Sequence, residues 1–328
     1  MSGLDADLII IGAGPAGLTA AQYGARANLK VLVIEQLGPG GQVLLIDVLE
    51  NYPGNIGHFD AAGNMIASPK TGYELSIDLQ RQAKSFGASF LSGSVTSLLK
   101  EDNFFTLGLS SGETRRAAAV IIATGSRHRL LGVSGEKEFT GRGVSYCATC
   151  DGNFFKGKKI LVVGGGDAAC DDAHYLSRLT TQVTLIHRRE GFRAQKALVE
   201  RTMNNPNIKV NLNRIIKEIK GGQKVQSVIL ENTKTGEVYE EETDAVFVFA
   251  GTLPQNSLVS QSDLKVDLDE NGYIMANQQM ETNVPGLYAA GDIRSGAFRQ
   301  VVTAAADGAV AAKYAAEYID EINYRESN

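Results

Sequence analysis

Residues 7–17 read DLIIIGAGPAG, and residues 159–169 read KILVVGGGDAA. In each stretch an apolar strand rich in β-branched side chains runs directly into a glycine turn. A helix-like segment follows both turns and leads to a second apolar strand, at 30–35 in the first case and at 182–187 in the second. Strand, glycine turn, helix and strand in this order are typical of the βαβ unit that binds dinucleotides.

The two stretches form an internal repeat with a single offset of 152 residues. Under that offset four key positions coincide: Gly12 with Gly164, Gly14 with Gly166, Gly17 with Ala169, and Glu35 with His187. Because one register fits all four, the match involves position as well as composition. Two dinucleotide units in one chain suggest a flavin together with a nicotinamide.

The first glycine turn is predicted to hold the pyrophosphate of FAD. Glycine lets the backbone approach the pyrophosphate, and the N-terminus of the following helix stabilises its charge. This role is assigned to the turn and the helix start: Gly12, Gly14, Pro15, Ala16 and Gly17. Glu35, 18 residues beyond Gly17, is expected to accept hydrogen bonds from the adenosine ribose. A glycine turn alone is weak evidence, since a tight strand–helix turn without a ligand has the same pattern.

The second glycine turn is predicted to bind NADPH. His187, Arg188 and Arg189 occupy the place of the acidic residue, and Arg193 follows one turn later. A carboxylate there would repel a 2′-phosphate, whereas arginine binds one through charge-assisted, often bidentate hydrogen bonds. A solvated basic surface patch is the alternative interpretation. The remaining NADPH contacts are assigned to Gly164, Gly166, Asp167, Ala168 and Ala169.

The rest of the chain completes two α/β domains. Residues 120–125 and 246–251 are apolar strands that end in glycine and close the first and second units. The tail has no third glycine fingerprint, so its alanine-rich helix from about 301 to 318 is expected to return to the first domain. We predict two Rossmann-like (three-layer ββα) domains, in which the NADPH-binding domain (127–253) is inserted into the FAD-binding domain (1–126 and 254–328).

The composition is typical of a soluble globular protein. The 328 residues are 43% hydrophobic and 21% charged, and the formal net charge of −5 argues against a nucleic-acid partner. No apolar run approaches the roughly 18 residues of a membrane helix, and the N-terminus lacks the regions of a signal peptide. We therefore expect a cytoplasmic protein without a membrane partner.

Cys147 and Cys150 form a CxxC pair within the stretch CATCD at 147–151. In a cytosolic chain this spacing indicates either a metal site or a redox-active dithiol. A zinc site would need two more soft ligands, but the sequence has no second CxxC and no HxxxH, so no metal is predicted. Asp151 is a candidate acid/base that protonates a leaving thiolate, although a helix-capping aspartate would have the same spacing.

Further motifs accompany the dithiol and cover nearly the whole chain. They are GAGPAG at 12–17, GGQ at 40–42, ENYPG at 50–54, ATG at 123–125, GRGVS at 141–145, CATCDG at 147–152, HRREGFRA at 187–194, AGD at 290–292 and RQ at 299–300. With these motifs the sequence resembles the low-molecular-weight, bacterial-type thioredoxin reductases, in the pyridine nucleotide-disulfide oxidoreductase family.

The resemblance implies an activity and a set of further FAD contacts. It implies a homodimer in which NADPH reduces FAD, and the flavin reduces a Cys147–Cys150 disulfide. Cys150 would face the flavin, Cys147 would attack the disulfide of thioredoxin, and Asp151 would supply protons. The implied additional FAD contacts are Gly41, Gln42, Asn51, Thr124, Gly125, Gly291, Asp292, Arg299 and Gln300.

The dithiol and the nicotinamide site would share the inserted domain, yet both must reach the flavin. The resemblance therefore supports a rotation of that domain about two linkers, near 126–130 and 252–256, between steps of turnover.

The chain departs from the family pattern at three places. The segment 55–71 is longer than usual, Ala168 stands where serine or threonine is usual, and Ala306 stands where glycine is usual.

Other functions of the same architecture stay open. The disulfide substrate could be a glutaredoxin-like protein or a peroxidase partner, and a non-enzymatic nucleotide sensor with a structural CxxC is the alternative of a different class. Ferredoxin- or flavin-fed relatives tend to lack the His-Arg-Arg pattern found at 187–189. The flavoprotein of alkyl hydroperoxide reductase carries an extra N-terminal dithiol domain, which is expected to be absent here.

Overall fold

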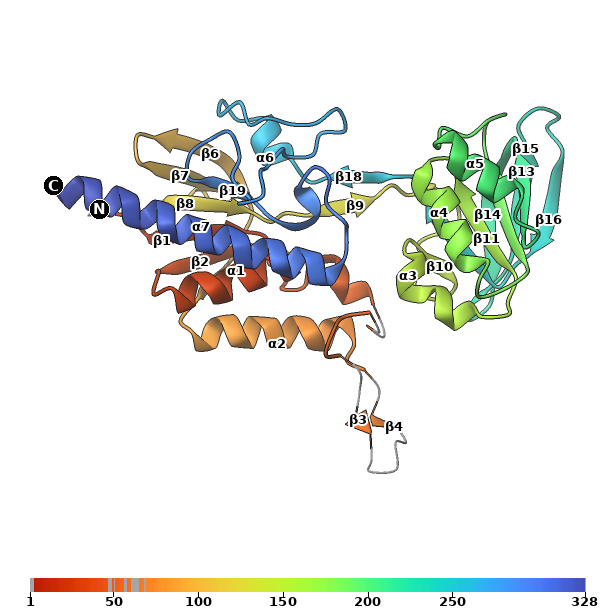
Figure 1. Cartoon of the computed structure of the whole chain (residues 1–328), viewed down its shortest axis with the longest axis horizontal. Helices are drawn as coiled ribbons and strands as arrows, with labels where there is room; N and C mark the ends of the chain where they lie inside the picture. The colour runs from red at the N-terminus through yellow and green to blue at the C-terminus, as the bar shows by residue number, and fades with distance from the viewer. Residues whose placement is uncertain are drawn as a thin grey trace. The chain divides into compact units, whose positions relative to one another are not determined.

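The computed structural model describes residues 3–46, 49, 51–55, 58–59, 65–67 and 69–327. It divides into two compact units (Figure 1). The first combines Met1–Arg127 with Leu253–Asn328, and the second is His128–Thr252. The chain passes between them in β9 (Ser126–His128) and β18 (Thr252–Pro254), which pair with each other.

Seven strands among the described residues of the first unit form one sheet, in the order β5-β2-β1-β8-β7-β6 with β19 also paired to β8. Strands β2 and β8, on either side of β1, are parallel to it. Strand β7 is antiparallel to both of its neighbours, β8 and β6. Their bounds are β1 Ala6–Ile11, β2 Val31–Glu35, β5 Ser89–Ser92, β6 Val95–Glu101, β7 Phe104–Leu109, β8 Thr114–Ile122 and β19 Leu287–Ala289. Side chains of β1 are buried on both faces of this sheet, which explains its unbroken apolar run.

Helices α1 and α7 of this unit pack against each other through small residues. Figure 1 shows α1 and α7 lying side by side, and a Cβ on Gly308 would overlap the carbonyl oxygen of Ala16. Ala306 lies on an exposed face of α7, so this departure from the family pattern does not touch α1. The elements are α1 Pro15–Arg26, α2 Gly72–Ser85, α6 Ser257–Ser260, α7 Val301–Ser327 and the short 3₁₀ turns η1 Gly41–Leu45 and η3 Gly291–Ile293.

The long 55–71 segment is closed at its base by one side chain. The amide of Asn55 donates to the carbonyl oxygens of Leu49 and Lys70, and its oxygen accepts from the Lys70 N–H. Two short antiparallel strands, β3 (His58–Phe59) and β4 (Met65–Ala67), lie within the segment. Residues 56–57, 60–64 and 68 of this segment, and Glu50 of the ENYPG motif, lie outside the described residues.

The second unit repeats the same plan on a smaller scale. Its parallel sheet has the order β10-β17-β11-β12-β13. A separate antiparallel sheet has the order β14-β15-β16. The parallel strands are β10 Val144–Ser145, β11 Ile160–Gly164, β12 Val183–His187, β13 Ile208–Leu212 and β17 Ala245–Phe249. The other elements are α3 Ala148–Asp151, η2 Gly152–Phe155, α4 Asp167–Leu176, α5 Lys196–Met203, β14 Arg214–Gly221, β15 Val225–Asn232 and β16 Val238–Glu242.

The predicted α/β class is confirmed, with a parallel sheet at the core of each unit. Both predicted strand–turn–helix–strand repeats occur, as β1-α1-β2 and β11-α4-β12. Within the described part of the chain, no helix combines the length and the apolar character needed to cross a membrane.

Candidate active site

In the glycine turn between β1 and α1, two glycines are required by close packing and a third faces open space. Gly12 has φ of 103°, and a Cβ there would overlap the carbonyl oxygen of Ala123; a Cβ on Gly17 would overlap that of Gly12. A Cβ on Gly14, by contrast, would meet no atom within 4 Å. Because no side chain caps α1 at Gly14, its first N–H groups fit an anionic pyrophosphate.

Glu35 ends β2 beside this turn. Its Oε2 accepts a 2.7 Å hydrogen bond from the Ala13 N–H, and its Oε1 accepts a 2.9 Å bond from the Leu37 N–H. These bonds fix the orientation of the carboxylate, and each oxygen keeps a further lone pair for a ribose hydroxyl.

Two distant segments come close to the first turn. A Cβ on Gly41, which has φ of 58°, would lie 3.4 Å from the Cα of Gly14. A Cβ on Gly291 would lie 2.9 Å from the Cβ of Ala16. Two of the glycines that only the family resemblance assigned to FAD therefore lie beside the turn that the repeat identified.

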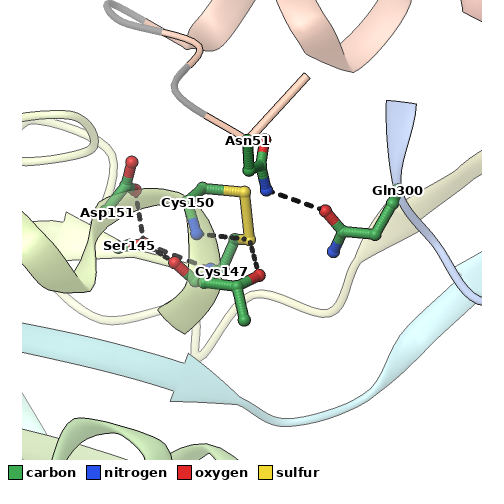
Figure 2. The surroundings of a disulfide bond; sticks show 7 residues. Asn51, Ser145, Cys147, Cys150, Asp151 and Gln300 are labelled. Atoms are coloured by element: carbon green, nitrogen blue, oxygen red, sulfur yellow. Dashed lines mark hydrogen bonds between the residues drawn. A yellow bond between two sulfur atoms is a disulfide. The ribbon is translucent and has the colours of Figure 1, made fainter. Parts of the chain in front are cut away.

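The other assigned FAD residues form hydrogen bonds within the first unit. Gln42 donates to the carbonyl oxygen of Ser126. Thr124 Oγ1 donates to the Gln255 carbonyl at 2.8 Å, next to Gly125 with φ of 70°. Asn51 Nδ2 donates to Gln300 Oε1 at 3.0 Å (Figure 2). Thus Asn51 and Gln300, 249 residues apart in sequence, lie in direct contact.

Asp292 of η3 lies near a second acid, Asp307 of α7, which sequence reasoning missed. Asp307 is buried and accepts hydrogen bonds from the Gly291 N–H at 3.1 Å and from Arg294 Nε at 3.0 Å. Burial raises the pKa of Asp292 to about 6, and Asp307 contributes to that rise while Arg299 opposes it. Arg299 stacks on Tyr273 at 4.4 Å, and its buried Nε has no hydrogen-bond partner among the described residues. This unpartnered donor fits a ligand with acceptor atoms.

We expect Asp292→Asn to stabilise the flavin-free chain at neutral pH but not at pH 4. The folded chain keeps the Asp292 proton up to about pH 6, whereas an unfolded aspartate releases it near its ordinary pKa of 3.8. The folded state therefore binds more protons, and the free energy of unfolding falls between these values by up to about 3 kcal/mol. Urea unfolding at both pH values measures the difference. The same difference at both would contradict the assignment.

The second glycine turn, between β11 and α4, likewise has one closely packed glycine and one that faces open space. A Cβ on Gly164 would lie 2.8 Å from the carbonyl oxygen of Phe249, whereas a Cβ on Gly166 would meet nothing within 4 Å. The segment after β12 folds back onto the turn, because Arg193 N–H donates to the Gly165 carbonyl at 2.7 Å. Asp167 accepts from the Gln195 N–H at 2.8 Å. Ala168 is exposed in the first turn of α4, and Ala169 is fully buried.

The basic residues at this turn differ in exposure. His187 is only 6% exposed, lies against Gly165 and stacks on Phe192. Burial lowers the pKa of His187, and the neighbouring arginines lower it further, so the ring is neutral at pH 7. Its Nε2 has no hydrogen-bond partner among the described residues. Three arginines are exposed: Arg188, Arg189 and Arg193.

Cys147 and Cys150 form a disulfide with a Cα–Cα distance of 5.3 Å (Figure 2). Cys147 is the N-cap residue of α3, and its Sγ accepts a 3.2 Å hydrogen bond from the Cys150 N–H. Cys170, the remaining cysteine, is buried in α4. Both sulfurs of the CxxC pair are joined to each other in this disulfide.

Asp151 is the last residue of α3, and its side chain caps neither α3 nor η2. Its Oδ2 accepts a 2.6 Å hydrogen bond from the Ser145 hydroxyl. Asp151 therefore stands at the N-cap position of η2 without a capping hydrogen bond, and its carboxyl accepts from Ser145 instead. Sequence reasoning included Ser145 in the GRGVS motif but assigned it no role, because a serine two residues before a CxxC pair has no distinctive spacing.

Comparisons with known proteins identify the family of this chain. A model of the pyridine nucleotide-disulphide oxidoreductase family matches residues 6–308. A thioredoxin reductase of Treponema pallidum is 50% identical over 97% of this chain and 98% of its own, and one of Bacillus subtilis is 44% identical over 96% and 95%.

Solved structures give the same result. A thioredoxin reductase of Streptococcus pyogenes is 38% identical, covers 96% of this chain and 98% of its own, and has a TM-score of 0.87. A Lactococcus lactis thioredoxin reductase in its FR conformation is 39% identical over 97% and 100%, with a TM-score of 0.64. With a family match from β1 into α7, a CxxC disulfide beside an acid, and relatives aligned over nearly their full length, this chain belongs to the pyridine nucleotide-disulphide oxidoreductase family, among the thioredoxin reductases.

Proposed function

We propose that this chain reduces the disulfide of thioredoxin with electrons from NADPH, through bound FAD and the Cys147–Cys150 disulfide. The observation that carries the proposal is the disulfide itself, formed between residues three apart, with Cys147 and Asp151 both bonded to Ser145. It belongs to the same unit as a glycine turn surrounded by exposed arginines.

The first unit would hold FAD. The open space at Gly14 and the uncapped start of α1 fit a pyrophosphate, and Glu35 fits a ribose. Asn51, together with Asp292, Arg299 and Gln300 from the C-terminal part of the unit, would take the rest of the cofactor. When bound, NADPH and FAD supply the two-electron reduction, and the side chains of this chain bind and orient them.

The second unit would hold NADPH. Open space at Gly166 fits its pyrophosphate, and Arg188, Arg189 and Arg193 provide exposed guanidinium groups for the 2′-phosphate. His187 is neutral and packed against Gly165, so it would shape this pocket rather than contribute charge.

The reduced dithiol would pass its electrons on by thiol–disulfide exchange. The Cys147 thiolate attacks one sulfur of the thioredoxin disulfide, which forms a mixed disulfide and releases one thioredoxin thiolate. The Cys150 thiolate then attacks Cys147 Sγ, restores the internal disulfide and releases the second thioredoxin thiolate. Each released thiolate takes up one proton, and Asp151 would supply a proton when the internal disulfide is reduced.

Anaerobic titration tests this function. NADPH is expected to bleach the visible absorbance of the purified flavoprotein, and addition of oxidised thioredoxin should restore it with one disulfide reduced per NADPH. If NADPH leaves the flavin oxidised, the proposed electron path is wrong. If a glutaredoxin-like protein or a peroxidase restores the absorbance and thioredoxin does not, the path stands but the substrate assignment fails.

Two alanine substitutions separate folding from flavin binding. Gly14→Ala should fold normally, because its backbone is extended and its Cβ meets no atom within 4 Å, but it should lose most bound flavin. Gly12→Ala should destabilise the chain itself, because φ is 103° and the Cβ overlaps Ala123. The flavin-to-protein ratio and the melting temperature of the flavin-free chain measure the two effects. Full flavin content in Gly14→Ala would refute the pyrophosphate site.

We also propose that the second unit turns about β9 and β18 during turnover, since its dithiol and its nicotinamide site must both serve the flavin of the first unit. A glycine with positive φ precedes each crossing strand: Gly125 with φ of 70° and Gly251 with φ of 99°. A reversible cross-link between the units should slow multiple turnover with thioredoxin at least about tenfold and recover on cleavage. Undiminished multiple turnover while cross-linked would contradict the rotation.

The resemblance further supports a homodimer in the cytoplasm. Analytical ultracentrifugation of the flavoprotein should give twice the 35.0 kDa mass of the chain. A monomeric mass at micromolar concentration would contradict the dimer.

A further inference from the structure

Ser145 forms hydrogen bonds both to the backbone of Cys147 and to the carboxyl of Asp151. It ends β10, at the edge of the parallel sheet, where it pairs with Phe247 of β17. Its side chain is only 4% exposed. The strand pairing and the burial hold its hydroxyl in one place, next to Cys147 and Asp151 (Figure 2).

Three polar atoms surround the Ser145 hydroxyl. The Cys147 N–H donates to its oxygen at 3.1 Å. Asp151 Oδ2 lies 2.6 Å away and the carbonyl oxygen of Cys147 lies 3.3 Å away, so both are acceptors for its proton. A hydroxyl has one proton and two lone pairs, and it therefore donates to one of these acceptors at a time.

The two acceptors correspond to the two charge states of Asp151. When the carboxylate is charged, the hydroxyl donates to Oδ2, and 2.6 Å is typical of such a charge-assisted bond. When Asp151 carries a proton, that proton can point to the Ser145 oxygen while the hydroxyl turns to the Cys147 carbonyl. A backbone N–H could only donate, and would stabilise the charged form alone.

We propose that Ser145 is the positioning residue for proton transfer by Asp151, linking the carboxyl to the backbone of Cys147 in both protonation states. This inference rests on the proposed function of the dithiol. Cleavage of the Cys147–Cys150 bond leaves a thiolate, which takes the carboxyl proton of Asp151. The Ser145 hydroxyl then turns from the Cys147 carbonyl to the new carboxylate. No bond to Ser145 other than hydrogen bonds forms or breaks.

Reduction by a phosphine tests the proposal without either nucleotide. Tris(2-carboxyethyl)phosphine attacks one sulfur, the other sulfur leaves as a thiolate and takes a proton, and water then converts the product to phosphine oxide and the second thiol. Alkylation of Cys147 and Cys150 followed by mass spectrometry gives the rate in the purified flavoprotein from pH 5 to 9. Ionisation of the phosphine affects all variants equally. The ratio of each rate to that of Asp151→Asn therefore gives the contribution of the Asp151 carboxyl to the rate.

We expect this ratio to be about ten for the wild-type chain at low pH and to fall to one as Asp151 loses its proton. In Ser145→Ala it should be several-fold smaller and should fall about one pH unit higher, because a hydrogen bond to the charged carboxylate is lost. Ser145→Thr keeps the hydroxyl and should restore the wild-type profile. Ser145→Ala should have no further effect when added to Asp151→Asn.

Two outcomes would overturn the role of Ser145. One is a Ser145→Ala profile equal to that of the wild-type chain. The other is an equal slowing by Ser145→Ala in the presence and absence of the Asp151 carboxyl, which would mean that the serine only supports the Cys147 backbone. Failure of NADPH to bleach the flavin would instead refute the proposed function and would leave the phosphine profiles unchanged.

Discussion

Cys150→Ser is expected to lower thioredoxin turnover by about 10³-fold or more while NADPH still bleaches the flavin. The remaining Cys147 thiolate can attack thioredoxin, but no second thiol is present to release it. A covalent complex of this chain with thioredoxin should therefore accumulate, and mass spectrometry of the unreduced sample would detect it. Cys147→Ser should lose turnover equally but should not accumulate that complex, because the attacking sulfur is absent.

Cys170→Ala is the matched control for these variants. Its thiol is fully buried in α4, and burial raises its pKa, so it is a poor nucleophile. Turnover should stay at the wild-type level. If Cys147→Ser were to trap thioredoxin and Cys150→Ser were not, the order of the two sulfurs would be the reverse of the one proposed.

The double change Arg188→Ala with Arg189→Ala is expected to raise the KM for NADPH about 100-fold, because two charge-assisted hydrogen bonds worth roughly 1.5 kcal/mol or more each are lost. Both side chains are exposed at the end of β12, where the first unit has Glu35. NADH lacks the 2′-phosphate, so its KM should change by less than about threefold. The rate of flavin bleaching as a function of nucleotide concentration measures both KM values.

Arg178→Ala provides the control for removal of a positive charge. Arg178 is exposed and follows the C-terminal end of α4, opposite the glycine turn. It should leave both KM values unchanged. Equal increases for NADPH and NADH in the double variant would refute the assignment of these arginines to the 2′-phosphate.

The nucleotide turns were predictable because their causes are local. An apolar strand, a glycine that must avoid overlap with a neighbouring carbonyl, and a helix start are encoded within about 30 residues. The repeat then placed Glu35 and His187 at equivalent positions, and both end the second strand of their units. The sequence alone also marked Cys147 and Cys150 as a pair, because CxxC spacing brings two sulfurs within reach.

Exposure at these turns was not predictable. His187, Arg188 and Arg189 are equally polar as a string of residues, yet the histidine ring is buried against Gly165 while both arginines are exposed. β12 ends at His187, whose ring packs against Gly165 and Phe192 where the following segment returns to the turn, whereas both arginines lie beyond the strand. Likewise, Asp307 reaches Gly291 and Arg294 only because α7 packs over η3.

By itself, the sequence determined the two βαβ units, their different charges and the redox-active pair, since each depends on residues near one another in the chain. Only the tertiary structure decided what surrounds that pair. Asp151 could have been a helix cap, but it lies at the end of α3 and bonds to Ser145. Ser145 is held there by pairing with β17, about 100 residues further along the chain. Hydrogen-bond partners of a buried hydroxyl are set by such long-range packing, which local spacing does not encode.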